Sequence, residues 1–257
     1  MLADPYDAIL LDLDGVLYRW PEPIEGAPEA VRRLRAAGKR IAFVTNNSSR
    51  TPAQVADRLA SVGVDADPGE VVTSALATAA LLEERRVASV FVIGEEGLRS
   101  ALADVGIRLV DHRDGGPVDA VVIGFDRSVD YGKLRDAAVL VGAGASLIAS
   151  NPDPSFPAPA GEAWPGAGSL LAVVETTTGV GGEVVGKPEA PLLRQALERA
   201  GGGRPLVVGD RLDTDIAGAV GLGWDSALVL TGSTTRDDLE GSRWSPTHVV
   251  DSVADLA

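Results

Sequence analysis

Short apolar runs, each followed by a stretch with helical spacing, recur along most of this chain of 257 residues. The runs stand at residues 8–11, 40–44, 89–93, 119–123, 146–150, 206–208 and 227–230. Strands that are apolar on both faces are typical of parallel sheets buried beneath helices. The alternation of such runs with helical segments therefore predicts an α/β fold built on parallel sheet.

The composition narrows the possible functions. The formal net charge is −14, and a surface of this sign repels phosphate backbones, so we expect no nucleic-acid or membrane partner. The chain has no cysteine, which excludes disulfides, thiolate catalysis and cysteine-based zinc sites. Its two histidines, His112 and His248, lie far apart in the sequence and do not support a histidine-based triad or metal site. The chain shows neither a signal peptide nor a membrane-spanning run, so a cytoplasmic location is expected.

Two aspartates, Asp12 and Asp14, follow the run at residues 8–11, and Gly15 allows the chain to turn away after them. Open α/β sheets hold their ligands at the carboxyl ends of strands. Two carboxylates this close repel each other unless a cation or a shared proton intervenes. We interpret the pair as a metal-assisted nucleophile with an acid/base neighbour. The alternative is a strand end with solvated aspartates and a glycine turn.

Further polar residues follow other predicted strands. Thr45 and Asn46 come after the run at 40–44, and their hydroxyl and amide groups, close to a helix N-terminus, suit phosphate oxygens. Lys187, before a proline, would neutralise a phosphate and the carboxylate that attacks it. Asp210 follows the run at 206–208 and would join Asp12 in holding a hard cation such as Mg²⁺.

Each of these clusters also has a purely structural interpretation. Residues 45–49 could form a loop with a helix N-cap, and Lys187 could be a solvated loop lysine. Asp213 and Asp215 could support the metal site, or one of them could be a first-turn acid that favours the helix dipole. Their joint placement after successive strands favours phosphoryl transfer, with Asp12 as nucleophile and Asp14 as general acid/base.

Four motifs stand at these strand ends: Asp12-Leu13-Asp14-Gly15, Thr45-Asn46-Asn47, Gly186-Lys187-Pro188 and Gly209-Asp210-Arg211-Leu212-Asp213-Thr214-Asp215-Ile216. With them the chain resembles the haloacid dehalogenase-like (HAD) phosphatases, in the subgroup of the NagD-type, p-nitrophenyl and phosphoglycolate phosphatases. Asn151-Pro152-Asp153 and the stretch 165–170 also resemble that subgroup. The overall pattern is most similar to actinobacterial glycerol 3-phosphate phosphatases.

The resemblance implies a Rossmann-like core with a parallel sheet, formed by residues 1–78 and 181–257, and an α/β cap domain inserted at residues 79–180. It implies a Mg²⁺-dependent phosphatase that hydrolyses small phosphomonoesters through an aspartyl-phosphate intermediate. Glycerol 3-phosphate is the leading substrate, and p-nitrophenyl phosphate and sugar phosphates are further ones. The expected partner is a small phosphorylated metabolite, and the resemblance also allows a homodimer formed through the cap.

The resemblance also implies roles for individual residues. Asp12 would be the nucleophile and Asp14 the acid/base. The metal ion would be held by the side chains of Asp12 and Asp210 and by the main-chain carbonyl of Asp14. The phosphate would be held by Thr45, Asn46, Asn47 and Lys187. We expect specificity to lie in the cap, around Asp126, Asn151 and Asp153.

Other functions use related chemistry. A phosphomutase would use the same aspartates but would have to exclude water. A receiver domain or another non-catalytic phospho-acceptor module would also form an aspartyl-phosphate, although such domains have the size of a single unit. A dehalogenase is disfavoured, because Asp14 and a metal site suit phosphate rather than a carbon–halogen bond.

Overall fold

The structure is a computed structural model that describes residues 1–112, 115–157 and 162–257. The chain forms two compact units. The first unit comprises residues 1–45, 52–72 and 187–257, and the second comprises residues 46–51 and 73–186. The resemblance implies an insert at residues 79–180. The two compact units divide after Val72 and after Gly186, and the second unit also includes residues 46–51.

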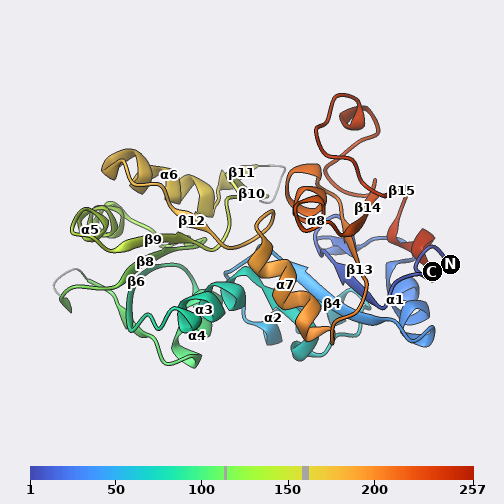
Figure 1. Cartoon of the computed structure of the whole chain (residues 1–257), viewed down its shortest axis with the longest axis horizontal. Coiled ribbons are helices and arrows are strands. Elements are labelled where there is room, and N and C mark those ends of the chain that lie inside the picture. The colour runs from blue at the N-terminus through green and yellow to red at the C-terminus, as the bar shows by residue number, and fades with distance from the viewer. Residues whose placement is uncertain (113–114, 158–161) are drawn as a thin grey trace. The chain divides into compact units, whose positions relative to one another are not determined.

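A six-stranded sheet forms the centre of the first unit (Figure 1). Its strands are β1 (Ala8–Leu11), β4 (Arg40–Thr45), β5 (Val71–Thr73), β13 (Pro205–Gly209), β14 (Asp225–Val229) and β15 (His248–Val250). Their spatial order is β15-β14-β13-β1-β4-β5, and β1 pairs in parallel with both β4 and β13. On one side of β1 the chain adds β4 and then β5. On the other side it adds β13, β14 and β15, so the direction in which successive strands are added reverses between β1 and β13. Ligands of α/β proteins bind outside the carboxyl ends of strands at such a position.

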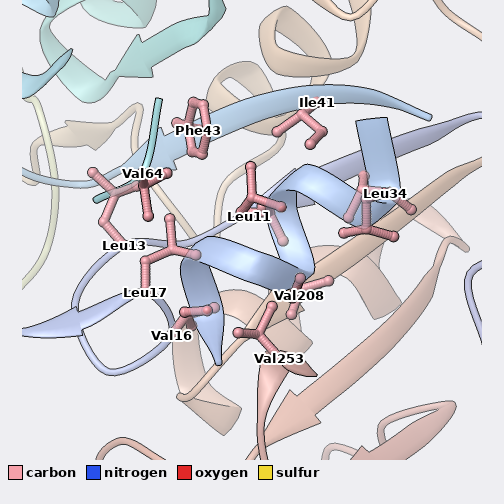
Figure 2. Packing of buried hydrophobic residues seen from close by; sticks show 14 of the residues in the cluster. Leu11, Leu13, Val16, Leu17, Leu34, Ile41, Phe43, Val64, Val208 and Val253 are labelled. Carbon is pink, nitrogen blue, oxygen red and sulfur yellow. The ribbon is translucent and has the colours of Figure 1, made fainter. Parts of the chain in front are cut away.

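Helices and short connections complete the first unit. The helices are α1 (Ala27–Ala36), α2 (Pro52–Ser61), α7 (Ala190–Arg199) and α8 (Ala217–Leu222). A small hairpin of β2 (Tyr18–Arg19) and β3 (Glu22–Pro23) follows β1, and short helical turns lie at Pro68–Glu70, Leu212–Ile216, Asp237–Leu239 and Val253–Leu256. Figure 2 shows how Leu11, Phe43 and Val208 of the sheet pack with Leu34 of α1 and Val253 in one buried cluster. This core supports the strand ends that carry the polar residues.

The second unit has its own five-stranded sheet. The strands are β6 (Ser89–Ile93), β7 (Arg108–Val110), β8 (Ala120–Ile123), β9 (Ser146–Ala149) and β12 (Glu183–Val184), in the spatial order β12-β9-β8-β6-β7 and all paired in parallel. The helices are α3 (Ser74–Glu84), α4 (Glu96–Asp104), α5 (Tyr131–Gly142) and α6 (Ala167–Thr178). Helices α5 and α6 bury Leu140 and Val174 against the strands, and α3 and α4 lie side by side (Figure 1).

The structure confirms the predicted α/β class with parallel sheets, and every described strand of four or more residues lies at one of the predicted runs. The shorter strands β5, β7, β12 and β15 of these sheets were not predicted. Residues 151–168, which are rich in proline, glycine and alanine, hold no apolar run like those that predicted the other strands. The described part of this segment contains the antiparallel strands β10 (Ser155–Pro157) and β11 (Ala163–Pro165), while 158–161 lie outside the described residues. The run at 227–230 is the last one in the sequence, but β15 follows it in the structure. Strands this short carry no readable periodicity. No helix in the described ranges is long and apolar enough to cross a membrane.

Candidate active site

Asp12 and Asp210 lie at the same edge of the first unit's sheet. The amide of Asp12 donates to the carbonyl of Val208 (2.9 Å), which extends the pairing of β1 with β13 by one residue. Asp210 follows Gly209, the last residue of β13. Because the two strands are parallel neighbours, their carboxylates meet. Carboxylate oxygens of Asp12, Asp210 and Asp215 all lie within 4.8 Å of one another.

Asp215 is the member of this cluster whose role the sequence left open. A helical turn at Leu212–Ile216 brings its side chain back to the strand ends, where its Oδ2 accepts a hydrogen bond from the Arg211 amide (3.2 Å). Only 1% of Asp215 is exposed. The side chain of Asp213 is 68% exposed and pairs with the Arg211 guanidinium at 2.9 Å. Both aspartates precede the same helix, so their spacing alone could not distinguish them.

Lys187 is buried between two of these carboxylates. Its Nζ lies 2.5 Å from Asp12 Oδ1 and 2.6 Å from Asp215 Oδ1, and its side chain is 3% exposed. The alternative interpretation of a solvated loop lysine is therefore wrong. Among the described residues, this one ammonium faces the three carboxylates of Asp12, Asp210 and Asp215. The cluster therefore carries more negative than positive charge.

The pKa shifts follow from this crowding. Burial raises the pKa of the Asp12 carboxyl well above its usual range. Lys187 opposes that shift, while the charges of Asp215 and Asp210 add to it. Burial and then Asp215 likewise raise the pKa of Asp210, against a hydrogen bond from the Ser233 amide (2.6 Å). Burial disfavours the Lys187 ammonium, but Asp12 and Asp215 outweigh burial and raise its pKa. Lys187 therefore stays charged at neutral pH.

Gly15 allows the chain to pass close to Asp210. Its φ is +81°, a conformation that L side chains rarely adopt. A Cβ built on Gly15 would lie 2.6 Å from Asp210 Oδ2. The Asp-x-Asp-Gly motif thus requires glycine both for its backbone conformation and for its contact with the second aspartate motif.

The carboxylate of Asp14 lies outside the buried cluster. Asp14 is exposed, and its Oδ2 accepts a hydrogen bond from the Tyr18 hydroxyl at 3.4 Å. Burial, followed by the charge of Asp14, raises the pKa of Tyr18 above its ordinary value, so the hydroxyl is protonated and acts as the donor. Nothing in the sequence marks Tyr18 as a site residue, because residues 13–25 carry no strand or helix periodicity.

The motif Thr45-Asn46-Asn47 is divided between the two units. Thr45 is buried at the end of β4 in the first unit. Asn46 belongs to the second unit, where its carbonyl accepts hydrogen bonds from Ser74 Oγ (2.6 Å) and Asn151 Nδ2 (2.8 Å). Its side-chain amide donates to Asp153 Oδ2 (3.1 Å). Two of the three residues that we associated with specificity therefore contact a predicted phosphate-binding residue.

The third of these residues, Asp126, is held elsewhere in the second unit. Its side chain is 2% exposed and accepts hydrogen bonds from the Ser128 hydroxyl (2.6 Å) and from Lys133 Nζ (2.8 Å). The side-chain oxygen of Asn47 accepts from the amide and hydroxyl of Ser49, at 2.9 and 2.7 Å. These contacts stabilise the local loops in which the residues lie.

The three clustered carboxylates fit a hard divalent cation. Mg²⁺ prefers oxygen ligands and is usually held by one or two carboxylates together with water. The buried cluster supplies these oxygens, and its excess negative charge favours a cation at this position. The donor set therefore fits the magnesium ion expected from the sequence.

Comparison with known proteins places the chain among phosphate-ester hydrolases and their relatives. Residues 9–108 match the family described as haloacid dehalogenase-like hydrolase, and residues 184–256 match the related HAD hydrolase-like family. The 5′-nucleotidase YutF of Bacillus subtilis is 41% identical to the chain over 253 residues, which cover 97% of each protein. An acid sugar phosphatase of Staphylococcus epidermidis is 41% identical over 246 residues, covering 95% of this chain and 93% of that protein. The crystal structure of the Mycobacterium tuberculosis glycerol phosphate phosphatase Rv1692 with magnesium has a TM-score of 0.94 and 38% identity, covering 99% of this chain and 77% of that one.

Proposed function

This chain belongs to the haloacid dehalogenase-like hydrolase family and hydrolyses phosphomonoesters, and we propose that it does so through an aspartyl-phosphate formed on Asp12. The observation that supports this most strongly is the contact of Lys187 with Asp12 at the strand ends where Asp12 and Asp210 meet. A carboxylate held by a buried ammonium is oriented for attack on phosphorus.

In the first half-reaction, a carboxylate oxygen of Asp12 bonds to phosphorus while the bond from phosphorus to the ester oxygen breaks. Asp14 gives its proton to that departing oxygen. In the second half-reaction, Asp14 takes a proton from water as the water oxygen bonds to phosphorus. The bond between phosphorus and Asp12 then breaks, inorganic phosphate leaves, and Asp14 is protonated again.

The other residues hold charges in place. The side chains of Asp12 and Asp210 and the main-chain carbonyl of Asp14 would hold Mg²⁺, which when bound offsets negative charge on the phosphoryl oxygens. Lys187 contributes positive charge from the protein itself and lies against the nucleophile. We assign Thr45, Asn46, Asn47 and Lys187 to the substrate phosphate. The first unit would act as the catalytic core and the second as the cap.

We propose glycerol 3-phosphate as the leading substrate, with p-nitrophenyl phosphate and sugar phosphates as further ones. The proposal is supported by the similarity of nearly the whole chain to a glycerol phosphate phosphatase. Relatives named 5′-nucleotidase and acid sugar phosphatase are the reason to test nucleoside monophosphates and sugar phosphates beside it. A comparison of kcat/KM across these esters ranks them.

Rapid acid quench with mass spectrometry tests the covalent step. Wild-type protein mixed with substrate and Mg²⁺ should carry a transient phosphoryl group on the peptide that contains Asp12. Asp12→Asn should lose both this group and phosphate release. Asp14→Asn should accumulate the group from p-nitrophenyl phosphate, because that leaving group needs no proton and water is no longer activated. Phosphate release by Asp12→Asn at the wild-type rate would rule out the nucleophile. Formation of a phosphate isomer instead of free phosphate would indicate a phosphomutase.

A further inference from the structure

The orientation of the Asp14 side chain bears on its proposed role. Asp14 is exposed, and it lies between the end of β1 and the turn at Gly15. A general acid must sit within hydrogen-bond reach of the oxygen that it protonates, so the contacts of its carboxyl group help to place the proton.

The hairpin that follows Asp14 returns to it through Tyr18. The amide of Gly15 donates to the carbonyl of Tyr18 (2.8 Å), and Asp14 and Tyr18 form an isolated β-bridge. The Tyr18 hydroxyl donates to Asp14 Oδ2 at 3.4 Å, while the residue is only 2% exposed. This distance is longer than the usual 2.5–3.0 Å, but catalytic hydrogen bonds often tighten when substrate binds.

The ring of Tyr18 is itself held in place by two neighbours. Trp20 packs edge-on against it, with ring centroids 6.2 Å apart. The guanidinium carbon of Arg58, on α2, lies 3.9 Å from the Trp20 centroid and 5.0 Å from that of Tyr18. Arg58 Nε is buried and has no hydrogen-bond partner within the part of the chain that the structure describes. The guanidinium of Arg58 is therefore within cation–π distance of both rings.

We propose that Tyr18 is a positioning residue for Asp14, and that Arg58 and Trp20 hold Tyr18 in place for this purpose. The Tyr18 hydroxyl engages Oδ2 of Asp14, so that the proton passed to the leaving oxygen is carried on Oδ1. The proposal rests on the acid/base role of Asp14 given above. It adds a residue from the β2–β3 hairpin to the catalytic arrangement.

Leaving groups of different basicity separate this role from a purely structural one. An alkoxide such as that of glycerol 3-phosphate needs a proton as it departs, whereas p-nitrophenolate is stable without one. Tyr18→Phe removes only the hydroxyl and keeps the ring between Trp20 and Arg58. Its kcat/KM for glycerol 3-phosphate should fall on the order of tenfold or more, and that for p-nitrophenyl phosphate should fall less than about threefold.

Two further variants complete the design. Arg58→Leu removes the stacked cation and should produce the same selective loss for the alkyl ester, independently of whether Tyr18→Phe is well folded. Tyr6→Phe is the matched control, because Tyr6 is also buried in the first unit but its hydroxyl contacts His248 (3.0 Å). It should keep wild-type rates with both esters. Circular dichroism and thermal melting would verify the fold of each variant.

The outcomes distinguish this proposal from the proposed function. If Asp14→Asn hydrolyses both esters at wild-type rates, the acid/base assignment fails and the role of Tyr18 fails with it. If the kcat/KM of Asp14→Asn falls more for glycerol 3-phosphate than for p-nitrophenyl phosphate but the kcat/KM of Tyr18→Phe changes equally for the two esters, or for neither, only the positioning role is overturned. A selective fall in the kcat/KM of Asp14→Asn, Tyr18→Phe and Arg58→Leu for glycerol 3-phosphate supports both.

Discussion

The ammonium of Lys187 lies 2.6 Å from Oδ1 of Asp215, and both side chains are almost fully buried. The same ammonium contacts Asp12, so Asp215 holds the lysine against the proposed nucleophile. A buried charge is sensitive to the loss of a partner, because no water replaces the missing interaction. We therefore expect Asp215 to position Lys187.

Substitution of the two neighbouring aspartates tests this role. Asp215→Asn should lower kcat for p-nitrophenyl phosphate by about 10–100-fold, because Lys187 loses one of its two anionic partners and shifts relative to Asp12. Asp213→Asn, the matched control, should keep kcat within about twofold, because exposed ion pairs contribute little. Equal kcat values for the two variants would contradict the assignment.

Metal binding should stabilise the folded protein. Thermal unfolding in EDTA and in increasing Mg²⁺ should show a Tm that rises with metal concentration, since an ion that binds only the native state adds about 2.7 kcal/mol at a concentration of 100 times Kd. Asp210→Asn should abolish the rise, and Asp213→Asn should retain it. A wild-type response in Asp210→Asn would show that the ion binds elsewhere.

Gly15 should be far less tolerant of a side chain than another glycine with a similar backbone. Gly38 has φ +76° with open space around it, so Gly38→Ala should cost about 1–2 kcal/mol of unfolding free energy and leave activity unchanged. Gly15→Ala carries the same backbone strain and also collides with Asp210, so it should cost more and reduce kcat. Urea denaturation and steady-state kinetics measure both effects, and equal costs for the two variants would argue against the contact with Asp210.

Asp126 should make stability depend on acid pH. Burial alone would raise its pKa, but hydrogen bonds from Lys133 and Ser128 outweigh burial, and the pKa is lowered from 3.8. A carboxyl whose pKa is lower in the folded state stabilises the protein above pH 3.8 and loses that contribution as pH falls through its folded pKa. At pH 7, Asp126→Asn should therefore unfold more easily than wild type, by about 1–3 kcal/mol.

Urea denaturation between pH 7 and pH 3 measures this dependence. The difference in unfolding free energy between wild type and Asp126→Asn should narrow below about pH 4, as the wild-type carboxyl becomes protonated. Asp104→Asn, at an exposed position in the same unit, serves as the control and should give a small difference at every pH. A difference that stays constant to pH 3 would show that Asp126 does not contribute through its charge.

The sequence alone was sufficient for the α/β class, for the positions of the described strands of four or more residues, and for the assignment of Asp12 and Asp210 to one sheet edge. These conclusions follow from local patterns, because an apolar run of strand length and the polar residue that ends it are adjacent in the chain. Neighbouring parallel strands then bring their ends together by geometry. The resemblance to a known family was likewise carried by short contiguous motifs.

Only the tertiary structure decided which of two aspartates supports Lys187, that Tyr18 contacts Asp14, and that Asn46 is held by Asn151 and Asp153. Asp213 and Asp215 have the same chemistry and almost the same position in the sequence, and the turn at Leu212–Ile216 buries one and exposes the other. Such contacts join side chains that come together only when the chain has folded. The type and spacing of the residues therefore do not predict which side chains will be in contact.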